Sequence, residues 1–293
     1  MGLFDGLEKY GLNLDTEDIF AEETVSGEEN TSGEKAPEEE KQEEKPLHEE
    51  EEFLLKRTMS CPVCEAKVPV LMVKNGRLRR MESDFDLRPR FQYIDTNKYD
   101  VTSCPKCGYT AMNRYFTHIS TLQIRLIRET ICSQFKPEEE QAPVSVYTYP
   151  QAIGRCKLAM VNAVVKKAKA SEKAYICLKL SWICRGWAES MEDKALSDEE
   201  LVASCRKEET AYYEQAYEGF LKAIASEGFP MCGMDENTMN LLMANMAFRL
   251  GKMDIASKLV SRILVSHVAS AKVKDRARDL KQEIIAKIHR GDR

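Results

Sequence analysis

The pattern of apolar and polar residues divides the chain into a strand-like part and a helical part. Between about residues 53 and 116 the apolar residues form short runs that are separated by turn residues. The run at 67–73, KVPVLMV, is rich in β-branched side chains and partly alternates, which predicts a strand. Asn75-Gly76 follows and favours a tight hairpin, so we expect 77–81 to return as the second strand.

From about residue 119 onward the spacing of apolar residues is helical. Pro150 favours a helix start, Ser197 with Glu200 three residues later forms a capping box, and Gly251 stands where a helix should end. We predict seven helices, near residues 119–135, 151–169, 171–189, 197–226, 235–250, 253–268 and 271–290. Their short connections predict antiparallel neighbours.

Small and branched residues of the last helices recur at the relative spacings of a tetratricopeptide repeat, in which small side chains let two helices approach. These residues are Ala244, Gly251, Ala256, Val260 and Ile263. The stretch at 212–224, YYEQAYEGFLKAI, resembles the second helix of such a repeat. A period of about 34 residues is not clearly sustained, so we describe the region as repeat-like helical hairpins.

The N-terminal part differs from the rest in charge. Residues 1–52 hold 19 acidic and 4 basic side chains, a net charge of −15, whereas the rest of the chain holds 29 acidic and 39 basic ones, a net charge of +10. Residues 21–52 contain 14 glutamates and almost no large apolar side chain, which predicts a disordered acidic linker. Residues 1–20 carry more apolar side chains than a solvated tail needs. We expect them to form a docking segment for a partner or for the protein's own helices, and its candidate contact residues are Leu3, Phe4, Leu7 and Tyr10.

Composition narrows the class of protein. Of the 293 residues 43% are hydrophobic, which is enough for a core even without the acidic tail. The start MGLFDGLEKYG lacks the pattern of an export signal, and no run reaches the roughly 18 apolar residues of a membrane helix. We therefore expect a cytoplasmic protein without membrane contact, whose ten cysteines are reduced.

Two nearly identical motifs contain four of these cysteines: SCPVCEA at 60–66 and SCPKCGYTA at 103–111. Each Cys-x-x-Cys pair presents two thiolates on a tight turn, and two such turns close a tetrahedron around one soft divalent ion. The spacing predicts a metal site whose ligands are Cys61, Cys64, Cys104 and Cys107. Four thiolates leave no open coordination position, so we expect a structural Zn²⁺ rather than a catalytic one.

Iron is the alternative metal, because the second motif looks like a rubredoxin knuckle. The first motif lacks the glycine that follows Cys107 in the second, which favours zinc. A redox-active pair of thiols would normally lie in a strand-helix-strand context, which this region does not show. The other six cysteines stand singly in helical sequence and are expected to be packing residues.

Four motifs of known enzyme sites are absent from the sequence: G-x-S-x-G, H-E-x-x-H, the phosphate-binding loop and the dinucleotide-binding glycine fingerprint. Asp84 and Asp86 could pair as acid and base, but ion pairs with the neighbouring Arg88 and Arg90 are favoured. We therefore expect a protein that is not an enzyme, and no small-molecule substrate is indicated. An unrecognised enzyme or a rubredoxin-like iron protein ranks third among the functions considered.

The segment between the two motifs carries a resemblance. The chain reads CPVC, then GRLRRMESDFDLRPRFQYIDTNKYDV, then CPKCGYTA, and helical hairpins follow. This order resembles an uncharacterised bacterial family that is catalogued as a domain of unknown function, over about residues 53–290. The resemblance implies a bacterial origin, a metal-binding pair of knuckles and a repeat-like helical region, and no established activity.

Together these features predict an α+β, mainly α protein. A zinc-ribbon-like domain at 53–118 is followed by antiparallel, tetratricopeptide-like helical hairpins at 119–290. The function we expect is a metal-binding scaffold or adaptor that binds a protein or peptide in the groove left by stacked hairpins.

Nucleic-acid binding is the alternative function. Residues 53–128 hold 14 Lys or Arg against 6 Asp or Glu, and Phe85, Phe91 and Tyr93 lie among the arginines. Such a mixture suits phosphate contact and base stacking. The candidate contact residues are Arg77, Arg79, Arg80, Arg88 and Arg90. The acidic linker is long enough to fold back on this surface and compete with a nucleic acid.

Overall fold

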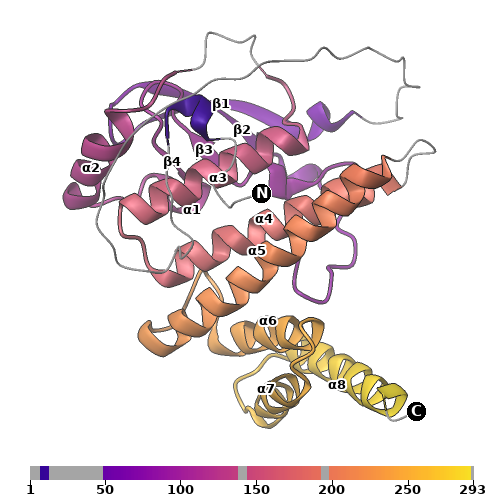
Figure 1. The fold of residues 1–293 in the computed structure, drawn as a ribbon. Coiled ribbons are helices and arrows are strands. Elements are labelled where there is room, and N and C mark those ends of the chain that lie inside the picture. The colour runs from indigo at the N-terminus through magenta and orange to yellow at the C-terminus, as the bar shows by residue number, and fades with distance from the viewer. Residues whose placement is uncertain (1–6, 13–48, 138–143, 193–197, 292–293) are drawn as a thin grey trace.

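The computed structural model describes residues 7–12, 49–137, 144–192 and 198–291 (Figure 1). This part of the chain is mainly helical and contains two small antiparallel sheets, which confirms the predicted fold class. Figure 1 shows the strands at one end of the molecule and the last three helices at the opposite end. None of the described helices is both long and apolar enough to cross a membrane.

Each sheet is a single hairpin. Strand β1 (Leu54–Ser60) pairs with β2 (Lys67–Val73), and β3 (Val101–Ser103) pairs with β4 (Thr110–Met112). The connections of both hairpins are the two cysteine motifs. Both hairpins together with the residues between them form the unit that we call the ribbon, residues 54–112.

The predicted hairpin at Asn75-Gly76 is wrong. Residues Asn75–Arg77 form a 3₁₀ turn, and residue 80 makes an isolated bridge to Phe91 instead of starting a strand. Strand β2 pairs with β1, which we did not predict. In β1 only Leu54 is buried, so the strand lacks the alternation that reveals a half-buried strand in a sequence.

The seven predicted helices are present and begin or end within a few residues of the expected positions. They are α2 (Thr121–Ile127), which continues as a π-helix (Arg128–Cys132), α3 (Tyr149–Val165), α4 (Ala170–Glu192), α5 (Glu199–Ser226), α6 (Glu236–Arg249), α7 (Met253–Val265) and α8 (Ala271–Gly291). A short helix, α1 (Asn113–Phe116), precedes them. Asp198 caps α5, while Ser197 of the predicted capping box lies outside the described residues.

Consecutive helices pack in pairs: α4 lies along α5, and α7 packs on both α6 and α8. Gly251 ends α6 with φ at 76°, which agrees with its expected position. The residues at the tetratricopeptide spacings, Ala244, Ala256, Val260 and Ile263, are buried between these helices. Their burial explains the pattern, while a true tetratricopeptide array stays a prediction.

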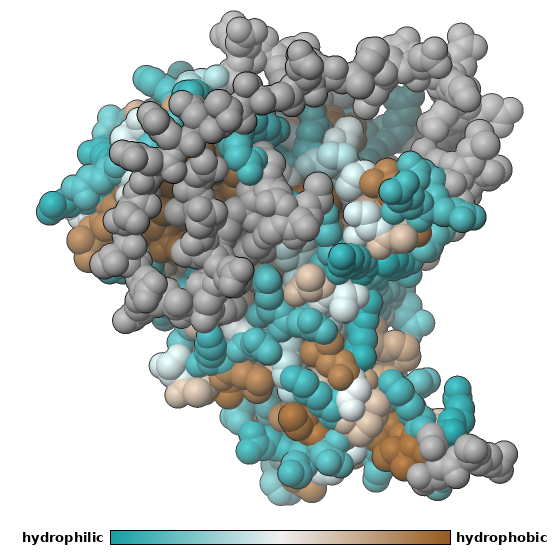
Figure 2. Space-filling model, in the orientation of Figure 1, coloured by the Kyte–Doolittle hydropathy of each residue, from teal (hydrophilic) through white to brown (hydrophobic). Residues whose placement is uncertain are grey.

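One continuous core joins the ribbon to the helices. It contains Val63 and Val68 of the ribbon, Met160 of α3 and Leu280 of α8, all almost completely buried. The predicted domain boundary at residue 118 is crossed by this core and stays a prediction. Figure 2 shows hydrophobic side chains also on the surface of the end that α6–α8 form.

Part of the N-terminal segment lies on the protein itself. Leu7 and Leu12 are buried, the ring of Tyr10 stacks on that of Phe135 at 5.8 Å, and the Lys136 N–H donates to the Tyr10 carbonyl at 3.2 Å. Residues 7–12 therefore dock in cis. Leu3 and Phe4 lie outside the described residues.

The predicted acidic linker ends earlier than expected. Most of residues 21–52 lies outside the described residues, but Glu50–Phe53 form a 3₁₀ turn that leads into β1. Glu50 accepts hydrogen bonds from Lys98 Nζ at 2.7 Å and from the Tyr99 hydroxyl at 2.9 Å. These two contacts hold the turn against the ribbon, which corrects the predicted disorder of residues 49–52.

Candidate metal centre and the ion-pair network beside it

Each cysteine motif folds as a tight turn between two strands. Cys61 directly follows β1, and Cys104 directly follows β3. The residue after the second cysteine of each motif, Glu65 or Gly108, has a left-handed backbone with φ of 61° or 74°. Its N–H donates to the carbonyl of the first cysteine, at 2.9 Å in one turn and 3.0 Å in the other. The two motifs thus adopt the same turn, as their similar sequences predict.

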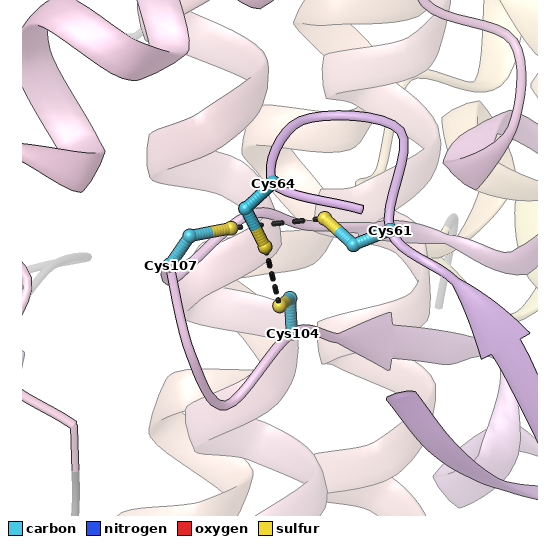
Figure 3. Close-up of side chains that lie close together, drawn as sticks. All are labelled: Cys61, Cys64, Cys104 and Cys107. Atoms are coloured by element: carbon cyan, nitrogen blue, oxygen red, sulfur yellow. Dashed lines mark hydrogen bonds between the residues drawn. The ribbon is translucent and has the colours of Figure 1, made fainter. Parts of the chain in front are cut away.

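The four sulfur atoms point toward one another and lie within 4.8 Å (Figure 3). Cys61 Sγ is 3.7 Å from Cys107 Sγ, and Cys64 Sγ is 3.6 Å from Cys104 Sγ, so each close pair joins one motif to the other. A tetrahedron with metal–sulfur bonds of about 2.3 Å has edges of about 3.8 Å. The sulfur atoms are therefore spaced to hold one metal ion, and they are too far apart for disulfide bonds of about 2.05 Å.

Three of the clustered thiols shift one another's pKa. The neighbouring thiols of Cys107 and Cys61, with the N–H groups of Cys107 and Lys106, lower the pKa of Cys104. The neighbouring Cys104 raises the pKa of both Cys61 and Cys107. Protons therefore remain on these two thiols when Cys104 is ionised. A metal ion that binds all four sulfur atoms has to displace those protons, so its affinity falls as the pH falls.

Helical side chains fasten both turns to the rest of the protein. Arg128 of the π-helix donates to the Val63 carbonyl at 3.0 Å through Nε, and Asn162 of α3 donates to the Gly108 carbonyl at 3.2 Å. A Cβ atom added at Gly108 would lie 2.4 Å from Cδ2 of Phe135. Position 108 therefore needs glycine both for its backbone conformation and for this close approach.

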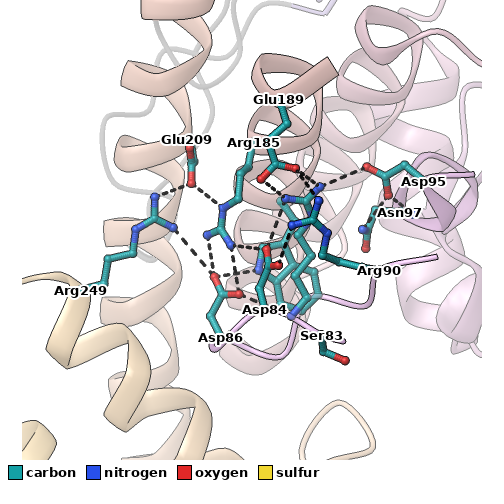
Figure 4. A network of polar contacts seen from close by, with 12 residues as sticks. Ser83, Asp84, Asp86, Arg90, Asp95, Asn97, Arg185, Glu189, Glu209 and Arg249 are labelled. Atoms are coloured by element: carbon teal, nitrogen blue, oxygen red, sulfur yellow. Dashed lines mark hydrogen bonds and ion pairs between the residues drawn. The ribbon is translucent and has the colours of Figure 1, made fainter. Parts of the chain in front are cut away.

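The structure also contains a buried ion-pair network, which connects loop 83–90 of the ribbon with α4, α5 and α6 (Figure 4). Arg185 of α4 is its centre. The guanidinium group binds Asp86 at 2.6 and 3.1 Å, Glu209 of α5 at 2.6 Å and Asp84 at 3.0 Å. Arg249 of α6 pairs with the same Glu209. Arg206 of α5 also binds Glu209, at 3.1 Å. The three carboxylates thus neutralise cations from three helices.

A second arginine extends this network along α4. Arg88 is buried and binds Glu189 through two hydrogen bonds of 3.1 and 2.9 Å, and it lies 3.9 Å from Asp95. These groups approach α4 where it carries Gly186. A Cβ atom there would lie 2.5 Å from Asp95 Oδ2 and 3.1 Å from Arg88 Nη2. This contact explains a glycine in the interior of a long helix, where glycine is otherwise unfavourable.

The charges of the network hold one another in their ionised forms. Burial alone would raise the pKa of Asp86 and of Glu209, but the positive charge and hydrogen bonds of Arg185 lower both below their usual range. Burial likewise disfavours the charged form of Arg185, yet Asp86 and Glu209 raise its pKa above the usual value. Loss of one partner would therefore leave a buried charge uncompensated.

The structure divides the five predicted nucleic-acid contacts into two groups. Arg88 is bound inside the network, and the partly exposed Arg90 pairs with Asp84 at 3.4 Å and Glu189 at 3.7 Å. The predicted ion pairs of Asp84 with Arg88 and Arg90 are thus confirmed, whereas Asp86 pairs with Arg185 of α4. The other three arginines, Arg77, Arg79 and Arg80, are exposed.

Sequence reasoning missed the helical half of the network. Arg185, Glu209 and Arg249 stand singly in helical sequence, where a charged residue usually indicates the solvated face. The glycine at 186 was a usable signal, because glycine inside a helix often marks a close approach. The signal does not name the approaching group.

Comparison with known proteins gives one match. The model of a family described as "Uncharacterized protein conserved in bacteria (DUF2225)" matches residues 54–284, which cover both the ribbon and the helices. No curated protein and no solved structure matches the chain.

Proposed function

We propose that this chain, which belongs to the DUF2225 family of uncharacterized proteins conserved in bacteria, is a non-enzymatic adaptor. A structural zinc ion stabilises its ribbon, and its C-terminal helices α6–α8 bind a protein partner. The observation that carries the proposal is the exposure of large apolar side chains on this end of the molecule. The family match agrees with the resemblance noted above and adds no activity.

Zinc is the metal that we propose for the four-cysteine cluster. The four thiolates complete a tetrahedron and leave no position for water or substrate, as in structural zinc sites. Glu65 takes the left-handed conformation without being glycine, so the missing glycine of the first motif does not separate zinc from iron. Metal analysis of the purified protein decides between them. About one equivalent of zinc is expected, and a coloured protein that contains iron would contradict the assignment.

The surface proposed for the partner lies on α7, α8 and their connection. Val265 and Val268 are 74% and 87% exposed, and Ile255, Ile285 and Ile288 are also exposed. Large apolar side chains that gather on a surface mark sites of protein interaction. Residues 249–291 also hold 11 basic and 4 acidic side chains. The partner that fits this surface is therefore a protein segment with both apolar and acidic side chains.

The test is capture of proteins by the full chain from a nuclease-treated lysate, followed by titration of the captured protein. We expect a double variant, Val265→Asp with Val268→Asp, to lose the partner. The control is Leu122→Asp, since Leu122 on α2 is a similarly exposed apolar residue outside α6–α8. A partner that binds the double variant and the wild type equally would contradict the proposed surface.

Nucleic-acid binding is the second candidate, and the three exposed arginines support it. Within the described residues Arg77, Arg79 and Arg80 have no carboxylate partner, and the exposed Phe85 lies in the same segment. If this surface binds phosphates, replacing the three arginines with glutamine should reduce the salt dependence of DNA or RNA binding by roughly one logarithmic unit for each lost contact. A salt dependence that does not change would exclude this surface.

A further inference from the structure

A second feature of the molecule, apart from the metal centre and the exposed end, is a cavity of about 550 Å³. It lies where α1 of the ribbon end meets the turn between α3 and α4 and the segment 227–233 that follows α5. Its volume is that of a pocket for a small molecule. Three elements that are far apart in the sequence thus line one cavity, which is open to solvent.

Three cationic side chains line this cavity: Arg114, Lys167 and Lys169. Within the described part of the chain none of them has a carboxylate partner. The Arg114 guanidinium donates to the Cys232 carbonyl and lies 5.8 and 5.7 Å from the ring centres of Tyr115 and Tyr175. Arg114 is therefore held in place at the cavity without loss of its charge.

The two acidic residues of the lining are already bound to other groups. Glu172 pairs with the buried Lys166 at 2.7 Å. Glu227 accepts hydrogen bonds from the N–H and the hydroxyl of Ser171, at 2.9 and 2.5 Å. Glu227 keeps its charge in these bonds. With Lys166 included, four cations face two carboxylates, so the lining has a net charge of about +2.

One of these cations, Lys167, has a strained backbone conformation. The turn after α3 has two hydrogen bonds, from Lys167 N–H to the Val164 carbonyl at 2.9 Å and from Ala168 N–H to the Ala163 carbonyl at 2.8 Å. This pair of bonds defines a Schellman motif, whose left-handed position favours glycine. The chain has Lys167 there instead, with φ at 50°. A strained residue whose side chain lines a cavity is typical of a functional site.

The opposite wall shows similar strain. Met231 and Met234 are joined by two backbone hydrogen bonds of 3.0 and 2.8 Å, and the two residues between them, Cys232 and Gly233, both have left-handed backbones. A Cβ atom at Gly233 would lie 2.6 Å from Arg114 Nη2. The tight turn thus permits the close approach of the arginine.

We propose that this cavity binds a small organic anion whose phosphate or carboxylate group pairs with Arg114, Lys167 and Lys169. Tyr115, Pro230 and Met231 of the lining offer apolar surface to the rest of the ligand. Charged hydrogen bonds from lysine and arginine are the usual means of holding such groups. The proposal is independent of the partner surface on α6–α8.

The test titrates the full chain with inorganic phosphate and, separately, with succinate at constant ionic strength, with calorimetry as the readout. We expect saturable binding of at least one of the two dianions. Binding of phosphate alone indicates a phosphorylated ligand, and binding of succinate alone indicates a carboxylate. Lys167→Gly and Lys169→Gln should each raise the dissociation constant by about tenfold or more, the effect of one lost charged hydrogen bond.

Lys167→Gly separates a binding role from a structural one. Glycine suits the left-handed position, so this variant should melt at a higher temperature than the wild type while it binds the anion more weakly. Lys258→Gln, which changes an exposed lysine of α7, is the matched control and should bind like the wild type. Absence of saturable binding of both dianions, or wild-type affinity in both cavity variants, would overturn the proposal.

Discussion

The four-cysteine cluster and the ion-pair network both fix the arrangement of the ribbon, but they are encoded differently in the sequence. The cluster consists of two short motifs with the same turn. Each motif supplies two cysteines and forms the connection of one hairpin. The network joins Asp84 and Asp86 to Arg185 and Glu209, which are about a hundred residues away in the sequence. The cluster is a local device within the ribbon, whereas the network connects the ribbon to the helices.

The largest expected effect is loss of the metal. Cys104→Ser removes one of four ligands, and metal binding in comparable sites contributes about 10–16 kcal/mol at neutral pH. We expect the ribbon to lose its protection from hydrogen exchange while α6–α8 keep theirs, because the ribbon's own core, around Leu71, Ile94 and Tyr99, is small. Hydrogen exchange with peptide resolution measures both regions in one sample.

Cys205→Ser is the control for this prediction. Cys205 is a buried cysteine of α5 and is not one of the four clustered cysteines, so this variant should keep the metal and the protection of the ribbon. Normal exchange of the ribbon in Cys104→Ser would show that the core shared with the helices is enough to fold it.

The next effect concerns the centre of the network. Arg185→Met keeps an apolar stem of similar length but removes the main partner of Asp86 and Glu209, which then face Arg249 and, for Glu209, also Arg206 of α5. Removing one partner from a buried ion pair costs about 3–5 kcal/mol, and urea unfolding should show a loss of this size. Arg125→Met breaks an exposed pair between Arg125 of α2 and Glu129 of the π-helix and should change the stability little. Equal losses in the two variants would mean that the network is not energetically special.

The pH dependence of stability in the wild type and in Arg185→Met tests the same network. The lowered pKa values of Asp86 and Glu209 contribute stability that is complete above the unfolded values, near 4, and is lost as the pH falls through the folded values. In Arg185→Met these carboxyls lack their main partner, so their protonation reduces the stability of the variant less than that of the wild type. The stability difference between wild type and variant should therefore shrink as the pH falls from about 6 toward 3. A constant difference over that range would contradict the role given to these carboxylates.

The comparison also explains which parts of the fold were predictable. The cysteine spacing and the helical periodicity depend on residues that are near in sequence, and both predicted the structure closely. The pairing of β1 with β2 was missed, because β1 is exposed over residues 55–58 and carries no alternation. A 3₁₀ turn at Asn75–Arg77 stands in place of the expected hairpin, and 77–81 form no strand beside β2.

Long-range electrostatics was beyond prediction for a different reason. Arg88 and Arg185 have the same side chain, and nothing nearby in the sequence shows that both are buried or which carboxylates they meet. The same holds for Lys167, whose left-handed backbone is visible only in the turn that it forms. We therefore predicted Arg88 as a surface contact, whereas the structure shows that it is buried.

The smallest expected effect is the loss of stability when alanine replaces glycine. It separates the cost of local backbone strain from the cost of a long-range contact. Gly108 and Gly251 both have a left-handed backbone, but a Cβ atom at 251 would meet nothing within 4 Å, whereas one at 108 would collide with Phe135. Gly251→Ala should cost about 1 kcal/mol, the backbone strain alone. Gly108→Ala adds overpacking, for a total of about 2–4 kcal/mol.

If Phe135→Ala is then combined with Gly108→Ala, the added cost should be largely relieved. Urea unfolding of the set measures this coupling, and equal losses for the two glycine variants would show that Phe135 moves aside freely and that position 108 is set by its turn alone.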